Sequence, residues 1–199
     1  MKAPALRRVA RQLAAAAFSA LCTLGLPAQA HAEGFISPLI GFDFGGDASC
    51  PAVSNCENKR LNFGVGLGAM NAVVGFEEEF AYARDFFGSA PTYKSSVLTV
   101  MSNLMLAPKV GPVRPYALAG LGLIKSHVEL TSTSLLSADN NNFGWDIGGG
   151  VMISLAPHVG VRGDVRYFHA FQDLTVVGFT LSNSKLDFGR AAAAINFTF

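Results

Sequence analysis

The stretch Asn142–Leu155, NFGWDIGGGVMISL, alternates between two kinds of residue over its whole length. One set is mostly large and apolar: Phe143, Trp145, Ile147, Gly149, Val151, Ile153 and Leu155. The other set is mostly small or polar: Gly144, Asp146, Gly148, Gly150, Met152 and Ser154. Successive side chains of a β-strand point to opposite faces, so this period of two predicts a strand with one apolar face.

The same alternation occurs in LNFGVGLGA (61–69) and SSVLTVMSNLML (95–106). Turn residues separate eight segments of this kind, at 35–44, 59–69, 73–84, 95–107, 114–129, 142–155, 160–171 and 186–199. Strands of globular proteins usually contain about five or six residues. A strand that crosses a membrane needs about 9–11 residues, which these segments provide.

The predicted links between the strands alternate in length. Four are long, at 45–58, 85–94, 130–141 and 172–185, and they alternate with three short ones, MNA, APKVGP and APHV. Long loops at one end and short turns at the other are typical of an outer-membrane barrel. We therefore predict an all-β fold, an eight-stranded antiparallel up-and-down transmembrane β-barrel with short periplasmic turns and long extracellular loops. A soluble eight-stranded barrel would have an apolar interior and a charged exterior, whereas here the face opposite the apolar stripe is mostly Gly, Ala, Asn and Ser.

The first 32 residues have the pattern of a secretory signal peptide. Four basic residues precede an apolar stretch at 13–26, and small residues offer cleavage points after Ala30 or Ala32. An N-terminal anchor helix is the alternative, although the apolar stretch is short for one. We expect residues 1–32 to be cleaved and residues 33–199 to form the barrel in the outer membrane of a Gram-negative cell.

The charge of the mature chain limits the candidate binding partners, and its cysteine content indicates a disulfide. Of the 15 Lys and Arg residues, four lie in the leader, so 11 remain against 14 Asp and Glu, a net charge of about −3. Without a basic stripe, nucleic acid is a poor candidate partner.

Cys50 and Cys56 remain after export, and an oxidising compartment favours a disulfide between them. A metal site is the alternative, but neither cysteine has a neighbouring His, and we expect no metal and no cofactor.

Charged side chains on the predicted inner face are the candidate functional residues. They are Asp43, Glu77, Glu79, Asp146, Arg162, Asp164, Arg166 and Arg190. We expect Glu77 and Glu79 to face Arg162 and Arg166 across the interior, with a second tier of Asp43, Asp146 and Arg190 above them. These charges could form an ion path, or a paired network that fills a lumen only wide enough for side chains.

One carboxylate does not fit the alternation. In VVGFEEEFAYAR (73–84), the apolar positions point outward and place Glu78 toward lipid, where an acidic residue is unfavourable. A β-bulge would turn Glu78 inward instead. The sequence leaves both orientations open.

The mature chain resembles the small outer-membrane barrels of Gram-negative bacteria, the OmpA/OmpX-like and opacity-type proteins. The resemblance rests on VGFEEEFAYARDFFG, VMSNLML, RPYALAGLGL, GWDIGGGV, VRGDVRYFHAF and the final INFTF. It implies that Ile195, Phe197 and Phe199 face lipid and form the signal that the barrel-assembly machinery reads. It also implies passage by periplasmic chaperones and contact with outer-membrane lipid and lipopolysaccharide.

We expect a non-enzymatic protein of envelope structure and surface interaction or adhesion, whose extracellular loops bind host or environmental surface molecules. A porin-like small-solute channel is the alternative. A lipid A-modifying enzyme is a third hypothesis, since lipid A deacylases are also eight-stranded barrels. Those enzymes carry a Ser two residues after a His, but here Phe171 stands two residues after His169, so the nucleophile of that motif is missing.

Overall fold

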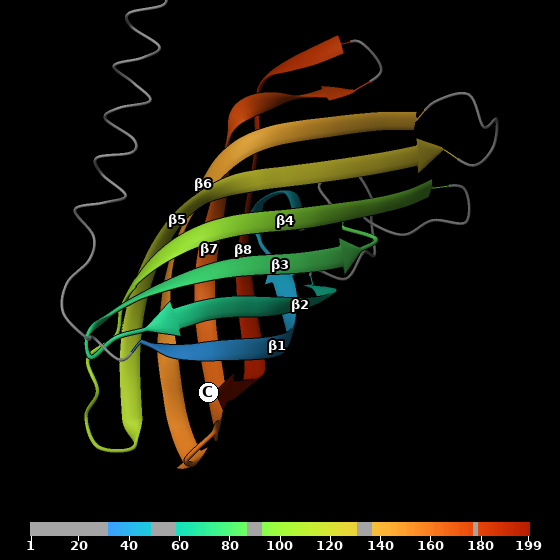
Figure 1. The fold of residues 1–199 in the computed structure, drawn as a ribbon. Helices are drawn as coiled ribbons and strands as arrows, with labels where there is room; N and C mark the ends of the chain where they lie inside the picture. Colours follow the sequence, from blue (N-terminus) through green and yellow to red (C-terminus); the bar gives the residue numbers. More distant parts are fainter. Residues whose placement is uncertain (1–31, 49–58, 87–92, 131–136, 177–178) are drawn as a thin grey trace, which may run out of the picture. The chain divides into compact units, whose positions relative to one another are not determined.

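The computed structural model describes residues 32–48, 59–86, 93–130, 137–176 and 179–199. These residues form a closed barrel in which each strand is antiparallel to its neighbours and the last strand pairs with the first (Figure 1). The strands are β1 (Glu33–Phe44), β2 (Lys59–Met70), β3 (Val74–Arg84), β4 (Tyr93–Leu106), β5 (Val113–Leu130), β6 (Ser137–Ala156), β7 (Val159–Val176) and β8 (Phe179–Thr198). A short 3-10 helix, Gly46–Ala48, follows β1. The prediction of an all-β, eight-stranded antiparallel barrel is confirmed.

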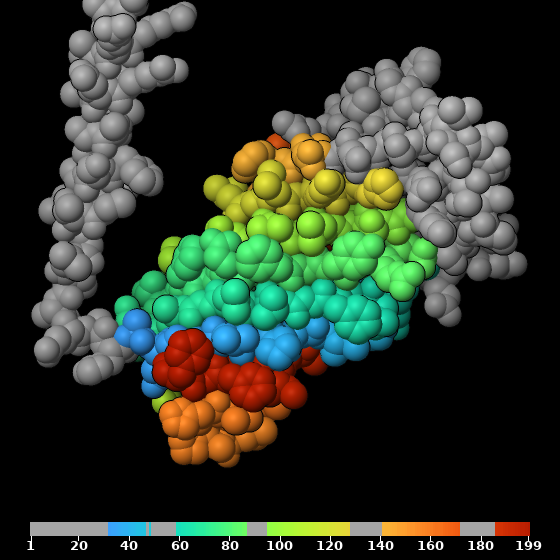
Figure 2. Space-filling model, turned by 45° about the vertical axis from the view of Figure 1, so that its right-hand side comes forward, coloured from blue at the N-terminus to red at the C-terminus, as the bar shows by residue number. Residues whose placement is uncertain are grey.

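The seam between β1 and β8 closes the barrel: residues pair from Leu39 to Phe44 and again at Phe35 and Ile36, with an interruption at Ser37 and Pro38. Figure 2 shows β1 (blue) with β2 on one side and β8 (red) on the other. Beyond the strand ladder, the backbone N–H of Gly34 donates to the carbonyl of Phe199 at 3.0 Å, and the N–H of Phe199 donates to the carbonyl of Gly34 at 2.9 Å. The barrel therefore has no open edge along this seam.

The strands are strongly tilted. A row of paired residues that starts at Glu33 returns to β1 ten residues further along, at Asp43. The row runs through Glu33, Met70, Gly75, Met105, Leu118, Gly148, Arg166, Arg190 and Asp43. With eight strands, this displacement corresponds to a tilt of about 40° from the barrel axis. Residues far apart in the sequence are thereby brought to similar depths in the interior.

Alternation sorts the side chains as the sequence predicts. Large apolar residues are exposed on the outer face of every strand, including Ile40, Phe63, Phe76, Leu104, Leu121, Ile147, Val165 and Ile195. Such a belt suits contact with lipid chains. Among the described residues, no helix is long and apolar enough to cross a membrane.

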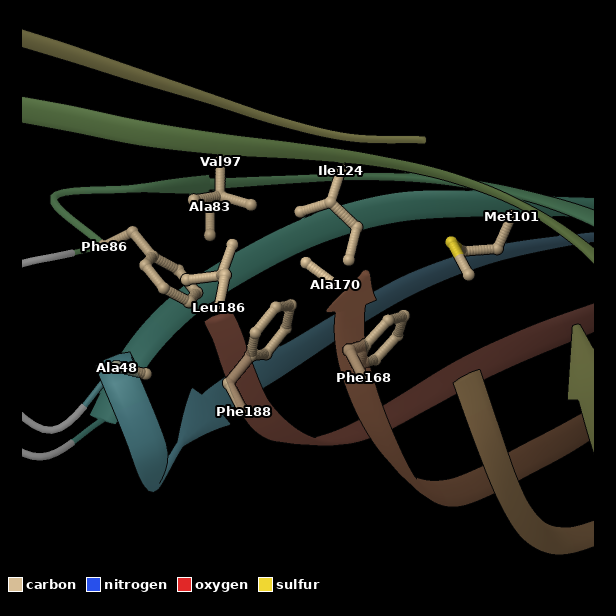
Figure 3. Packing of buried hydrophobic residues seen from close by; sticks show 10 residues of the cluster. All are labelled: Ala48, Ala83, Phe86, Val97, Met101, Ile124, Phe168, Ala170, Leu186 and Phe188. Carbon is tan, nitrogen blue, oxygen red and sulfur yellow. The ribbon is translucent and has the colours of Figure 1, made fainter. Parts of the chain in front are cut away.

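Two apolar clusters lie inside the barrel. The lower cluster is near the short turns and contains Phe35, Met70, Met105, Ala107, Tyr116, Leu118 and Met152. The upper cluster is near the opposite end and contains Ala48, Ala83, Phe86, Val97, Met101, Ile124, Phe168, Ala170, Leu186 and Phe188 (Figure 3). The rings of Phe168 and Phe188 stack with centroids 4.8 Å apart.

The last four strands are longer than predicted. They contain 18 to 20 residues each, whereas β1 to β4 contain 11 to 14. The pairs Thr175–Thr180 and Val176–Phe179 lie within the segment 172–185, for which the sequence predicts a loop. Thr, Val and Phe favour strands, and this preference outweighs the turn signal of the Ser and Asn residues in the segment. Two hairpins, β5–β6 and β7–β8, therefore extend beyond the first four strands at the long-loop end.

Candidate functional site

The interior between the two apolar clusters is charged. All eight charged residues that the sequence places on the inner face are buried there: Asp43, Glu77, Glu79, Asp146, Arg162, Asp164, Arg166 and Arg190. They come from β1, β3, β6, β7 and β8, because alternation turns every second side chain of each strand inward. The largest fully buried side chains of the barrel are two of these arginines, Arg166 and Arg190.

Arg166 is the centre of the network. Its Nη2 atom lies 2.9 Å from Oε1 of Glu77 and 2.8 Å from Oε2 of Glu79. Its Nε atom donates to Oδ1 of Asp164 at 3.1 Å, and Nη1 lies 3.7 Å from Oδ2 of Asp146. One guanidinium therefore neutralises carboxylates from three strands, β3, β6 and β7.

Arg162 lies closer to the short turns. Both of its terminal nitrogens donate to the carboxylate of Glu77, Nη1 to Oε2 and Nη2 to Oε1 at 3.1 Å. The Nε atom donates to Oδ2 of Asp164 at 2.9 Å and to the Tyr116 hydroxyl at 2.7 Å. That hydroxyl in turn donates to Oδ2 of Asp164 at 2.5 Å.

Arg190 binds the carboxylates nearer the upper cluster. Its Nε atom donates to Oδ1 of Asp43 at 2.7 Å, and Nη1 donates to Oε1 of Glu79 and to the Thr99 hydroxyl, both at 3.0 Å. The guanidinium carbon lies 4.6 Å from the ring centroid of Phe168. A cation over an aromatic face is stabilised by the ring's quadrupole.

The two expected tiers are one connected network. Glu79 contacts both Arg166 and Arg190, and Asp146 forms its ion pair with Arg166, whereas the sequence predicts that it lies in one tier with Arg190. The strand tilt explains the difference, because it shifts the depth at which β6, β7 and β8 present their inner residues relative to β3.

Neutral polar side chains complete the network, and the sequence analysis did not single them out. Asn62 donates to Oδ1 of Asp43 at 2.7 Å. With its amide nitrogen turned toward Asp146, Asn103 donates to both oxygens of that carboxylate, at 2.8 and 3.1 Å. With Tyr116, these residues bring neutral donors to a group of five carboxylates and three arginines. Their inward position in the alternation is the signal that could have found them.

Glycines on the inner face make room for these side chains. A Cβ atom at Gly150 would lie 2.6 Å from Cβ of Asp164 and 2.7 Å from the Tyr116 hydroxyl. A Cβ atom at Gly120 would lie 2.6 Å from Oδ1 of Asp146 and 2.6 Å from the backbone oxygen of Ser102. Real Cβ atoms essentially never show contacts this short, so a larger residue at either position would force its neighbours to shift.

Below the lower cluster, a cavity of about 350 Å³ opens at the short-turn end. Its charged lining residues are Glu33, Lys109 and Arg114. Met152, a member of the lower cluster, also lines it. The cavity therefore ends at the apolar layer that separates it from the charged network.

His169, considered above for a catalytic role, belongs to an aromatic group on the outer face. The His169 ring centroid lies 5.7 Å from that of Trp145 and 6.4 Å from that of Tyr167. The Tyr167 hydroxyl donates to Oδ2 of Asp187 at 3.0 Å. Aromatic residues with polar tips suit the boundary between lipid chains and headgroups.

The remaining sequence-derived sites lie elsewhere. Three residues at the end of the chain point outward and are exposed: Ile195 and Phe197 on β8, and Phe199 directly after it. Cys50 and Cys56 lie outside the described residues. No group of three or more potential metal ligands occurs among the described residues.

A closed barrel with an apolar outer belt and a filled polar interior defines the class of small membrane-spanning barrels. A family model, the outer membrane protein beta-barrel domain, matches residues 16–199, and the chain belongs to this family. The protein therefore resides in the outer membrane, and its outer face contacts membrane lipid. No curated protein sequence matches the chain.

Solved structures of several outer-membrane proteins share the fold. Neisserial surface protein A superposes with a TM-score of 0.62 at 15% identity, covering 84% of this chain and 97% of that one. Ail, the attachment invasion locus protein of Yersinia pestis, was solved with the heparin analogue sucrose octasulfate. Ail superposes with a TM-score of 0.56 at 15% identity, covering 84% of this chain and 99% of the Ail chain. OprG of Pseudomonas aeruginosa superposes with a TM-score of 0.55 at 13% identity, covering 84% of this chain and 96% of the OprG chain.

Proposed function

We propose that the protein is a non-enzymatic outer-membrane barrel that contributes to envelope structure and binds surface molecules through its extracellular loops. The observation that carries this proposal is the filled interior. An apolar layer at each end encloses a layer of paired charges, and the arginines and carboxylates of that layer are almost fully buried. A lumen occupied in this way leaves the outer ends of the strands as the surface available for interaction.

The lengths of the strands support a role for the extracellular end. The hairpins β5–β6 and β7–β8 extend past the other strands at the end with the long links. A rigid barrel holds such segments in a fixed arrangement, as in other proteins whose loops bind ligands. The attachment protein Ail has the same fold and was solved with a sulfated sugar. Polyanionic surface sugars are accordingly among the host or environmental molecules to test first.

Export and assembly are part of the same proposal. Residues 1–32 act as a cleaved secretory signal, and periplasmic chaperones deliver residues 33–199 to the barrel-assembly machinery. The outward Ile195, Phe197 and Phe199 are recognised there. In the membrane, the outer belt contacts lipid and lipopolysaccharide.

Two measurements test the proposal, one on the refolded mature protein and one on cells that express it. In planar bilayers, we expect no stable conductance, because charged and apolar layers fill the lumen. Cells that express the protein should adhere to sulfated polysaccharide or host-cell surfaces, and replacing the extended hairpin tips with short turns should abolish adhesion without unfolding the barrel. Large, steady channels would favour the porin-like alternative. A change in the mass of lipid A upon expression would reveal an enzyme.

A further inference from the structure

The cavity at the short-turn end carries an excess of positive charge. Two of its three charged lining residues are cations, Lys109 and Arg114, and the third is Glu33. Neither cation forms an ion pair within the part of the chain that the structure describes. Because the short turns of such a barrel are periplasmic, the cavity faces the periplasm.

Arg114 differs in this respect from the arginines of the charged network. It occupies an inward position of β5, where it pairs in register with the buried residue Met152. Farther inside the barrel, Arg162, Arg166 and Arg190 each contact at least two carboxylates. The positive charge of Arg114 is not neutralised in this way, so it can attract an anion from the periplasm.

Asn196 brings a hydrogen-bond donor to the same cavity. The residue is only 7% exposed, and its Oδ1 atom accepts a hydrogen bond from the Ser37 hydroxyl at 2.6 Å. Its Nδ2 atom has no acceptor among the described residues, although Asn196 lines the cavity. In the registers of β6, β7 and β8, Gly160 pairs with Ser154 on one side and with Asn196 on the other, so no side chain separates these two polar residues. A buried donor without a partner is unusual in a folded protein, and here it adjoins open space.

We propose that this cavity binds an oxyanion, a carboxylate or phosphate group, from the periplasm. Arg114 offers donors in a planar fork that matches either group, and Lys109 adds a second positive charge. The Nδ2 atom of Asn196 donates from the inner wall. Glu33 opposes the anion, so that removing its charge should strengthen binding.

The size and place of the cavity define the ligand further. A volume of about 350 Å³ accommodates a small molecule or the acidic end of a longer one. The apolar layer that contains Met152 separates the bound anion from the charged network. The site lies at the opposite end of the barrel from the long links, and it is therefore separate from the surface interaction proposed above.

Calorimetric titration of the refolded mature protein in non-ionic detergent at low salt tests the site, with inorganic phosphate and succinate as probes. We expect one equivalent of at least one probe to bind per chain. Arg114→Gln should weaken this binding by about tenfold or more, since it removes a charged donor. Glu33→Gln should strengthen it about threefold, because a like charge is removed. Lys125→Gln is the control: it removes an exposed cation at the other end of β5 and should leave the affinity unchanged.

Asn196→Asp separates a role in ligand binding from a role in the fold. The new carboxylate still accepts the hydrogen bond from Ser37, but it presents negative charge to the cavity in place of a donor. Heat-modifiable migration on gels should show a folded barrel, while binding should weaken by about tenfold or more. A preference for phosphate or for succinate supports the site and identifies which oxyanion it takes. Binding of neither probe, or binding that Arg114→Gln and Asn196→Asp leave unchanged, would overturn the proposal.

Discussion

The Nη1 atom of Arg190 lies 3.0 Å from Oε1 of Glu79, so that an ion pair joins β8 to β3 across the barrel interior. The other carboxylate oxygen of Glu79 lies 2.8 Å from Nη2 of Arg166. Glu79 thus connects the charges near the upper apolar cluster to those near the lower one. The network acts as a single unit, and removing one member affects carboxylates on several strands.

We predict that Arg166→Ala strongly destabilises the barrel. Arg166 contacts four carboxylates, and its loss leaves buried negative charge without compensation. Breaking a buried ion pair in this way typically costs about 3–5 kcal/mol. The measurement is urea-induced unfolding of the refolded protein in lipid vesicles.

Arg84→Ala is the matched control, because Arg84 is exposed at the end of β3. Its effect should stay below about 0.5 kcal/mol, as expected for a surface substitution. Arg166→Lys should be intermediate, since lysine keeps the charge but lacks the planar fork that reaches several carboxylates. If Arg166→Ala and Arg84→Ala unfold at the same urea concentration, the network does not hold the strands together.

A second prediction concerns the space that the network occupies. Gly150→Ala should destabilise the barrel by about 1–3 kcal/mol, because the added methyl group collides with the backbone oxygen of Gly163 as well as with Asp164 and the Tyr116 hydroxyl. Gly163→Ala provides the comparison, since a Cβ atom there meets nothing closer than a backbone oxygen at 3.9 Å. Unfolding midpoints of the two variants should therefore differ clearly, and equal midpoints would show that the interior is loosely packed.

The fold could be predicted from the sequence because the decisive signal is local. In Asn142–Leu155, the alternation of residue types along the strand shows which side chains face lipid and which face the interior. The same parity places Asp146 and Arg166 inside without knowledge of any other strand. It also places Glu78 outside, where the chemistry of a carboxylate left the assignment in doubt.

The pairing within the interior could not be predicted in the same way. Which carboxylate meets Arg190 depends on the displacement of ten residues around the barrel, and this displacement is set by all eight strand registers together. Sequence alternation within one strand carries no information about register. For that reason the sequence pattern groups Asp146 with Arg190 although Asp146 contacts Arg166, and it does not identify Asn62 and Asn103 as supporting donors.

The third prediction is a disulfide between Cys50 and Cys56 in protein taken from the outer membrane. An oxidising compartment favours pairing of two cysteines that are separated by five residues. Titration with a thiol reagent under denaturing conditions should detect no free thiol before reduction and two after it. Cys50→Ser should leave the unfolding midpoint of the barrel unchanged, because the sequence places both cysteines in the predicted long link 45–58 and outside the predicted strands. Two free thiols in the unreduced protein would contradict the pairing.

The last prediction separates assembly in the cell from stability of the folded barrel at Phe199. The Phe199 side chain is 73% exposed, while its backbone N–H and C=O pair with Gly34. A Cβ atom at Gly34 would lie 2.5 Å from the Phe199 ring, so the ring occupies the space that the glycine leaves free. Phe199→Asp keeps both backbone hydrogen bonds and removes one lipid-facing ring near the rim, where a charge costs at most about 1 kcal/mol. Refolding into detergent should therefore proceed almost as in the wild type.

If the outward Ile195, Phe197 and Phe199 are recognised during assembly, the amount of Phe199→Asp protein in the outer membrane should nevertheless fall sharply, with unfolded protein accumulating in the periplasm. Phe171→Asp, which changes an exposed aromatic residue near the other end of β7, serves as the control and should reach the membrane at close to wild-type levels. Equal membrane levels for the two variants would show that Phe199 is an ordinary lipid-facing residue.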